Sequence, residues 1–338
     1  MFFDFEDYRP DISPVGRAIS WREGVLLSII VHLAAMAGRL GIELDLEGFD
    51  RMGRDTPVLV DLKPTGQHYM EDLDKAGGVT TILRELKPQL KLKALTITGK
   101  TLGQNIDEAP PGWAQDVVRP FSNPIFKGGS IAVLRGNLAP GGAIVKQAAA
   151  SPALMQHEGR AVVFDSLPDM AARIDAPDLD VKPDDILVLR NAGPIGAPGM
   201  PEAGALPIPK KLGSKGVTDM VRISDARMSG TAFGTVVLHV SPESCANGPL
   251  RAVRDGDPIV LDVEAGRLDL DIPAEEITRR LEELGPPTPR YSRGYGRMYV
   301  DHVLQADEGC DFDFLRAVPG EEPQTLPYGL LTGSIGGW

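Results

Sequence analysis

The stretch DMVRISDARMSGTAFGTVVLHV, residues 219–240, holds two apolar, β-branched runs on either side of a glycine-containing corner. This composition favours two short strands joined by a loop. Six further runs of the same kind, separated by Gly, Pro and Asp, lie around it: SIAVLRG (130–136), GAIVKQA (142–148), RAVVFDS (160–166), DILVLRN (185–191), DPIVLDV (257–263) and RLDLDI (267–272). Together with 38 glycines and 29 prolines, they predict a barrel or sandwich.

The part of the chain before these runs has a different residue pattern. Residues 1–23 have no sustained period and predict an irregular lead-in, whereas residues 24–41 predict a buried helix that ends near a glycine. A strand at TPVLVDL (56–62) and helices at HYMEDLDKAGG (68–78) and VTTILRELK (79–87) follow. We therefore expect an α/β segment first and a mainly-β domain after it, with the boundary near residues 90–105.

Two helices are expected within the mainly-β part. They are MPEAGALPIPKKL (200–212) and PAEEITRRLEELG (273–285). The second is amphipathic, with Ile277, Leu281 and Leu284 on one face.

Charge and cysteine content exclude several classes of protein. The 338 residues carry a formal net charge of −12, and no run of Lys or Arg forms a nucleic-acid patch, so a nucleic-acid partner is not expected. The chain has two cysteines, Cys245 and Cys310, which provide neither a CxxC pair nor a disulfide framework and suit a reducing cytoplasm. The apolar stretch at 25–37 is too short to cross a bilayer and follows an acidic segment, unlike a signal peptide. We expect a cytoplasmic protein without a membrane partner.

The corner between the two central runs presents Ser229, backed by Gly230, with Asp225 and Arg227 beside it. A serine hydroxyl is inert unless a neighbouring base or a metal ion activates it. No histidine lies within nine residues, since the nearest in sequence is His239, and the G-x-S-x-G elbow is absent. Ser229 is either a turn serine or a catalytic residue activated by a metal.

A second candidate is Glu202, the acid of the loop NAGPIGAPGMPEAGALP, residues 191–207. Glycines in such a loop allow close approach of the backbone to a ligand. Glu202 is either an acid at the start of a helix, favoured by the helix dipole, or a carboxylate ligand of Mg²⁺.

Several blocks of sequence occur in a characteristic order: TPVLVDLKPTGQHYMEDLDKAGGV, LTITGKTLGQN, AVLRGNLAPGGAIVK, GPIGAPGMPE, ISDARMSGT and HVSPE. From about His32 to about Leu315 the chain resembles the dihydroxy-acid dehydratase and phosphogluconate dehydratase family. MSGTAFGTVVLHVSPE and QADEGCDFDFL resemble its sugar-acid branch, the pentonate dehydratases such as arabinonate or xylonate dehydratase.

This resemblance implies an activity and a set of cofactors. Family members remove water from a 2,3-dihydroxy carboxylate and form a 2-keto-3-deoxy acid, with an iron–sulfur cluster acting on the 3-hydroxyl and Mg²⁺ holding the carboxylate and 2-hydroxyl. By matching motifs, Ser229 falls on the serine that takes the C2 proton and Glu202 on the glutamate that ligates Mg²⁺. The implied substrate is a small sugar acid, and family members are homo-oligomers.

The chain also departs from the family. No block matches the cluster cysteines, and Cys245 and Cys310 match no ligand position. The family's Gly-Gly-Ser-Thr-Asn is replaced by residues 24–28, and residues 1–23 resemble nothing in it. The resemblance therefore predicts the C-terminal part of a sugar-acid dehydratase, inactive without a separate N-terminal half that carries the cluster. The alternatives are a dihydroxy-acid dehydratase of branched-chain amino-acid biosynthesis and a non-catalytic remnant or ligand-binding module.

The family fold implied for this chain has two parts after the lead-in. Residues 24–95 are expected to be the tail of an α/β N-terminal domain. Residues 96–338 are expected to form a swivelling β/β/α, barrel-like C-terminal domain.

Overall fold

The computed structural model describes residues 23–42, 44, 46–63, 66–110, 115–204, 206–228 and 233–318. Ser229 and residues 1–22 of the expected lead-in lie outside this part of the chain.

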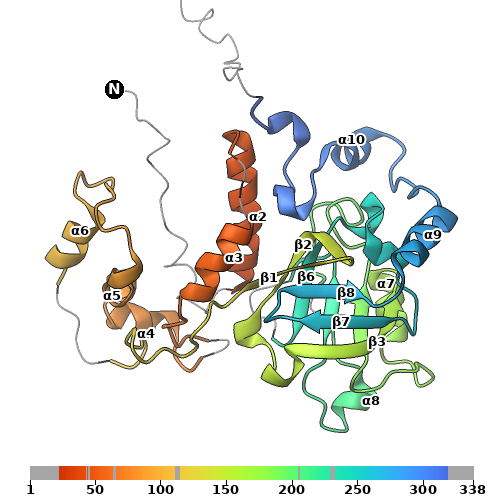
Figure 1. Cartoon of the computed structure of the whole chain (residues 1–338), viewed down its shortest axis with the longest axis horizontal. Helices are drawn as coiled ribbons and strands as arrows, with labels where there is room; N and C mark the ends of the chain where they lie inside the picture. Colours follow the sequence, from red (N-terminus) through yellow and green to blue (C-terminus); the bar gives the residue numbers. More distant parts are fainter. Residues whose placement is uncertain are drawn as a thin grey trace, which may run out of the picture.

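Figure 1 shows strands that surround a common core next to the early helices. Eight strands close into this barrel in the order β1-β2-β6-β5-β4-β3-β7-β8. Each of the eight apolar runs overlaps one strand, so these predictions are confirmed, and of the predicted barrel or sandwich the structure has the barrel. The strands are β1 (Ala132–Gly136), β2 (Ala139–Val145), β3 (Gln156–Phe164), β4 (Ile186–Leu189), β5 (Arg222–Ser224), β6 (Val236–Ser241), β7 (Pro258–Asp262) and β8 (Arg267–Leu270).

Alternating side chains of the strands fill the barrel and cover its outside. In β4, Ile186 and Val188 belong to the interior cluster, whereas Leu187 and Leu189 pack on the outer side with Phe164. All four β4 residues are fully buried. A strand covered on both faces is expected to be apolar throughout, and the sequence ILVL meets that requirement.

Four consecutive strands of the barrel are parallel. β3 pairs with β4, β4 with β5, and β5 with β6, all in the parallel sense. Their carboxyl ends therefore meet at one edge, which we call the carboxyl edge. In α/β sheets this edge is where ligands usually bind.

Helices surround the barrel and form the part before it. α7 (Leu167–Arg173), α8 (Lys210–Gly213), α9 (Ala274–Leu284) and α10 (Gly294–His302) follow strands of the barrel. Before it come α2 (Glu23–Arg39), α3 (Leu46–Asp55), α4 (Met70–Lys75), α5 (Gly78–Glu85) and α6 (Leu102–Glu108). In Figure 1, α2 and α3 stand between the barrel and the group of α4, α5 and α6.

The early helices have two kinds of core. Leu59, Ile82 and Leu86 belong to a cluster of their own around α4 to α6. Ile30 of α2 and Phe49 of α3 instead pack against barrel residues that include Met228 and Leu238. The predicted helices at 24–41, 68–78 and 79–87 are confirmed, and α2 is anchored on the outside of the barrel.

Two sequence expectations are wrong. Residues 56–62 make isolated bridges, such as Val58 to Phe126 and Val60 to Val118, because they meet irregular segments one residue at a time rather than a neighbouring strand. Of the described residues in 200–212, none before α8 is helical, since prolines at 201, 207 and 209 interrupt helical hydrogen bonding.

The predicted helix at 273–285 exists as α9, with Ile277 buried and Leu281 partly buried against the barrel cluster, but Leu284 is 48% exposed. Within the described part of the chain, no helix is sufficiently long and apolar to span a membrane.

Candidate functional site

Three segments that resemble family motifs leave the barrel at the carboxyl edge. The loop 191–204 follows β4, and we call it the Glu202 loop. Residues 225–234, called the serine segment, follow β5, and HVSPE spans the end of β6 and the turn after it. The parallel pairing of these strands brings together motifs that are far apart in sequence.

Glu202 lies directly beside the serine segment. It forms an isolated parallel bridge with Arg227, and the Gly204 amide donates to the Arg227 carbonyl at 2.6 Å. The Arg227 Nη1 atom lies 3.4 Å from Glu202 Oε1, and Arg227 Nε donates to the Met200 carbonyl. Glu202 is therefore held by a strand-like contact rather than placed at the start of a helix, which was one of the two alternatives.

The Glu202 side chain is available to a ligand. It is 48% exposed, and its partner Arg227 is 35% exposed. A partly exposed ion pair of this kind is worth about 0–1 kcal/mol, so a divalent cation can compete with the guanidinium for the carboxylate. Mg²⁺ often takes one or two protein carboxylates and completes its shell with water or substrate oxygens. Glu202 fits the role of one such ligand.

Ser229 lies outside the described residues, but the chain on both sides of it is described. Met228 is 2% exposed and packs with Leu238 of β6, whereas Phe233 is 59% exposed. Asp225, which stands near the serine in sequence, is fully buried beneath the site and accepts backbone hydrogen bonds. Among the described neighbours of Ser229, Arg227 contacts Glu202.

His239 lies at the site, although its separation from Ser229 in sequence gave no indication of this. Its backbone amide donates to the Ala226 carbonyl at 3.1 Å, so the pairing of β5 and β6 brings it to the serine segment. The register of β2 and β6 shifts around it, and its φ of 54° is unusual for a residue other than glycine. Bulges of this kind often redirect a side chain beside an active site.

The imidazole of His239 is buried and electrically neutral. The residue is 4% exposed, and neither ring nitrogen has a hydrogen-bond partner among the described residues. Burial, with a smaller contribution from the positive charge of Arg227, lowers the pKa of His239 to about 4. The family block HVSPE contains this histidine, but nothing in the sequence distinguishes it from a core residue.

A second buried titratable residue lies at the end of β2. Lys146 is 1% exposed, and burial lowers its pKa to about 8. Three residues further on, the Ala149 carbonyl accepts the amide hydrogen of Gly234, the last residue of the serine segment.

The two cysteines do not fit an iron–sulfur cluster. Cys245 Sγ contacts Asn191 Oδ1 at 3.3 Å, and Cys310 Sγ contacts Met200 Sδ at 3.2 Å. Burial, reinforced by the charge of Glu243, raises the pKa of both thiols to about 12, so both are protonated in the fold. Across the described residues, no three His, Cys, Asp or Glu side chains are grouped to hold a metal.

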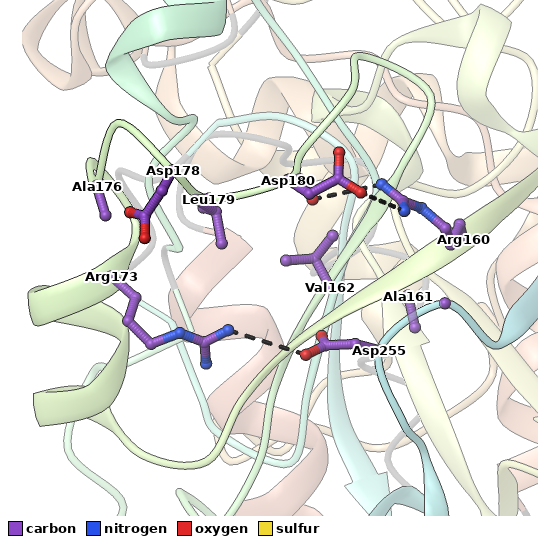
Figure 2. Close-up of a pocket in the computed structure, with 10 residues that line it drawn as sticks. Arg160, Ala161, Val162, Arg173, Ala176, Asp178, Leu179, Asp180 and Asp255 are labelled. Carbon is purple, nitrogen blue, oxygen red and sulfur yellow. Dashed lines mark hydrogen bonds and ion pairs between the residues drawn. The ribbon is translucent and has the colours of Figure 1, made fainter.

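A pocket of about 520 Å³ lies elsewhere, between β3 and the segment that follows α7 (Figure 2). Four of the charged residues that line it form ion pairs: Arg160 Nη1 lies 2.7 Å from Asp180 Oδ2, and Arg173 Nη2 lies 3.9 Å from Asp255 Oδ2. None of the residues lining this pocket belongs to the three segments at the carboxyl edge. The candidate site is therefore the carboxyl edge.

Comparison with known proteins assigns both parts of the chain. Residues 28–105 match the family model described as dihydroxy-acid/6-phosphogluconate dehydratase N-terminal. Residues 116–310 match the model for the C-terminal part of the same proteins.

Individual relatives are similar over most of this chain. An L-arabonate dehydratase of Azospirillum brasilense is 52% identical over 302 residues, which are 87% of this chain and 52% of that protein. An L-arabinonate dehydratase of Rhizobium leguminosarum bv. trifolii (strain WSM2304) is 47% identical, covering 86% and 50%. A 6-deoxy-6-sulfo-D-gluconate dehydratase of Pseudomonas putida is 45% identical, covering 89% and 52%. The chain spans about half the length of these curated relatives, and it belongs to the dihydroxy-acid/6-phosphogluconate dehydratase family.

Proposed function

We propose that this chain carries part of the active site of a sugar-acid dehydratase. The reaction removes water from a 2,3-dihydroxy carboxylate of the aldonate class and gives a 2-keto-3-deoxy acid. The support is the family membership together with the three relatives, whose names each specify a sugar-acid dehydratase.

The observation that carries the proposal is the bridge between Glu202 and Arg227 at the carboxyl edge. It brings the candidate metal ligand beside the segment that contains the candidate base. In this proposal, Glu202 is one ligand of Mg²⁺, and Ser229 receives the proton from C2 of the substrate. A bound Mg²⁺ would supply positive charge toward the substrate carboxylate and 2-hydroxyl. Arg227 keeps the Glu202 carboxylate oriented when no cation competes for it.

Cys245 and Cys310 take no part in this proposal, because their environments do not suit cluster ligands. Any cluster that the family resemblance implies is held by residues other than these two cysteines. The remaining groups of the site are expected in the part of these relatives that this chain does not match. We also propose that the complete enzyme is a homo-oligomer, as the family resemblance implies.

An assay of the reaction tests the proposal. The chain is incubated anaerobically with Mg²⁺ and L-arabinonate, alone and with a polypeptide covering the unmatched part of the Azospirillum brasilense relative, and the 2-keto-3-deoxy acid formed is measured. We expect product only with both polypeptides, and we expect Ser229→Ala to abolish it. The matched control is Ser214→Ala, which removes an exposed hydroxyl next to α8.

The outcomes separate the alternatives. Dehydration of a branched-chain dihydroxy acid in preference to sugar acids would assign the chain to the other branch of the family. Binding of a sugar acid without product under any condition would favour a ligand-binding module. An unchanged rate in Ser229→Ala would overturn the proposed role of the serine.

A further inference from the structure

The Glu202 loop has a backbone conformation that depends on partners outside it. Asn191, Gly199 and Met200 have φ angles of 61°, 84° and 43°. Positive φ is unfavourable for residues other than glycine and persists where the surroundings determine the conformation. The partners of this loop therefore decide where it places Glu202.

The beginning of the loop is held from the end of β5. Asp225 is fully buried and accepts backbone hydrogen bonds from Asn191 at 3.1 Å and from Ala192 at 2.9 Å. Its Oδ2 atom also accepts the amide hydrogen of Ser244 at 3.0 Å. The first residues of the loop are thereby tied both to the serine segment and to the turn after β6.

The middle of the loop is held from the end of β6. Glu243 is 1% exposed, and its two carboxylate oxygens accept hydrogen bonds from the amides of Ile195 at 2.7 Å and Gly196 at 2.9 Å. Gln305 Nε2 donates to the same carboxylate at 3.1 Å, and Gln305 Oε1 accepts the amide hydrogen of Glu243 at 2.8 Å. Hydrogen bonds to an ionised carboxylate are stronger than those between neutral groups.

Gly193 shows how closely the carboxylate approaches the loop. A Cβ atom at this position would lie 2.6 Å from Glu243 Oε2, a distance that real Cβ atoms do not adopt. A larger residue at position 193 would therefore have to displace either the carboxylate or the loop. Gly193 therefore allows the Glu243 carboxylate to lie directly against the loop backbone.

We propose that Glu243 is a positioning residue for Glu202, acting through the hydrogen bonds that it accepts from Ile195 and Gly196. It joins the HVSPE block of β6 to the Glu202 loop, and Asp225 joins the serine segment to the same loop. The importance of Glu243 for catalysis rests on the proposed function of Glu202. The control of the loop geometry by Glu243 is independent of that function.

The electrostatic surroundings make this contact sensitive to pH. Burial, reinforced by the charge of Asp225, raises the pKa of Glu243 to about 7. Once Glu243 is protonated, the carboxyl oxygen that carries the hydrogen is a poorer acceptor for the backbone N–H that faces it. The other titratable or charged groups near Glu243 are Cys245 in η5 (Ser244–Ala246), Arg290 after α9, Tyr299 in α10, Asp307 in η7 (Ala306–Glu308) and Cys310 after η7.

Amide NMR of the full chain tests the proposal without any dehydration assay. We expect the amide protons of Ile195 and Gly196 to shift with a midpoint near pH 7 and the Glu202 amide to follow the same midpoint. Glu243→Gln should abolish this titration and displace the Glu202 signal. Gly193→Ala alters the loop partner of Glu243 rather than Glu243 itself, and it should also displace the Glu202 signal. The control is Asp257→Asn, which alters a buried carboxylate paired with Arg280 in a different part of the barrel.

Mg²⁺ affinity is measured on the same samples by calorimetry. Because groups that support a metal ligand typically change affinity by about 10–100-fold, we expect a loss of that size in Glu243→Gln and none in the control. A Glu202 signal that stays in place in both folded loop variants, or across the pH range in which Gly196 titrates, would overturn the positioning role. If the variants displace the Glu202 signal, while the wild-type chain together with a polypeptide covering the unmatched part of its relatives binds no Mg²⁺, the positioning role is supported and the proposed role of Glu202 as a metal ligand is contradicted.

Discussion

Arg227 Nη1 lies 3.4 Å from Glu202 Oε1, and the backbones of the same two residues form a parallel bridge. The side-chain contact is half exposed and weak, whereas the bridge beneath it is fixed by the barrel. This combination keeps a carboxylate in place while leaving it free to exchange its partner for a cation.

Glu202→Gln should separate ligand binding from stability. We expect Mg²⁺ affinity to fall by at least about tenfold, since even groups that merely support a metal ligand have effects of that size. Stability should change by less than about 1 kcal/mol because the ion pair is exposed. Calorimetric titration and urea unfolding measure the two quantities. Glu275→Gln, an exposed acid in the first turn of α9, is the control and should change neither.

His239 should make the protein less stable in acid. Its pKa is about 4 in the fold against 6.5 for the free side chain, so the unfolded state binds the extra proton as pH falls from 6.5 to 4. The corresponding loss of stability is about 3 kcal/mol. His239→Asn, which tolerates positive φ and does not titrate, should remove it.

Urea unfolding between pH 4 and 7 measures the effect as the difference between wild type and His239→Asn. The comparison with His239→Asn is needed because Glu243 makes the free energy of unfolding change with pH in the opposite direction. Its pKa is raised from 4.5 to about 7 in the fold, so its contribution falls as pH rises through that range. Identical pH slopes in the two proteins would contradict a buried, neutral imidazole.

Gly204→Ala should disturb the junction between the Glu202 loop and the serine segment. A Cβ atom there would lie 2.3 Å from Leu238 Cδ2 and 2.8 Å from the Arg227 carbonyl oxygen. Overpacking of this kind costs about 1–3 kcal/mol, and thermal unfolding measures it. At Gly213 an added Cβ would meet no atom within 4 Å, so Gly213→Ala should be neutral or slightly stabilising. Equal melting temperatures for the two variants would show that the junction can relax.

Asp219→Asn should destabilise both strands that flank the serine segment. The Asp219 carboxylate lies 2.9 Å from Arg222 Nη2 and accepts hydrogen bonds from the amide and hydroxyl of Thr235. Both charged side chains are less than a tenth exposed, and breaking a buried pair costs about 3–5 kcal/mol. Asp180→Asn removes an exposed partner of Arg160 and should have a much smaller effect on stability, because water screens the charges of an exposed pair. Urea unfolding of the two variants compares these costs.

The two thiols should be unreactive in the folded protein. With pKa values of about 12, Cys245 and Cys310 are almost entirely protonated at pH 8, and the thiolate is the reactive form. We expect Ellman's reagent to label neither cysteine in the native state and both in guanidinium chloride. Rapid labelling of either one in the native protein would contradict a buried thiol with a raised pKa.

The local pattern of residues determined much of this fold. Each of the eight apolar runs became a strand, because short β-branched segments between Gly, Pro and Asp have few alternatives. The stretch at 56–62 has the same composition, yet it makes isolated bridges because no regular strand lies beside it. Strand formation needs a partner, and a partner is a property of the tertiary structure.

The sequence by itself identified Glu202 and Ser229 as candidates and placed them in separate motifs. The tertiary structure decided that Glu202 meets Arg227, that His239 reaches Ala226, and that Glu243 supports the Glu202 loop. The physical reason is the parallel pairing of β4, β5 and β6, which brings the carboxyl ends of strands distant in sequence to one edge. Residue patterns along a chain specify strands, whereas the order of strands around the barrel specifies which side chains share a site.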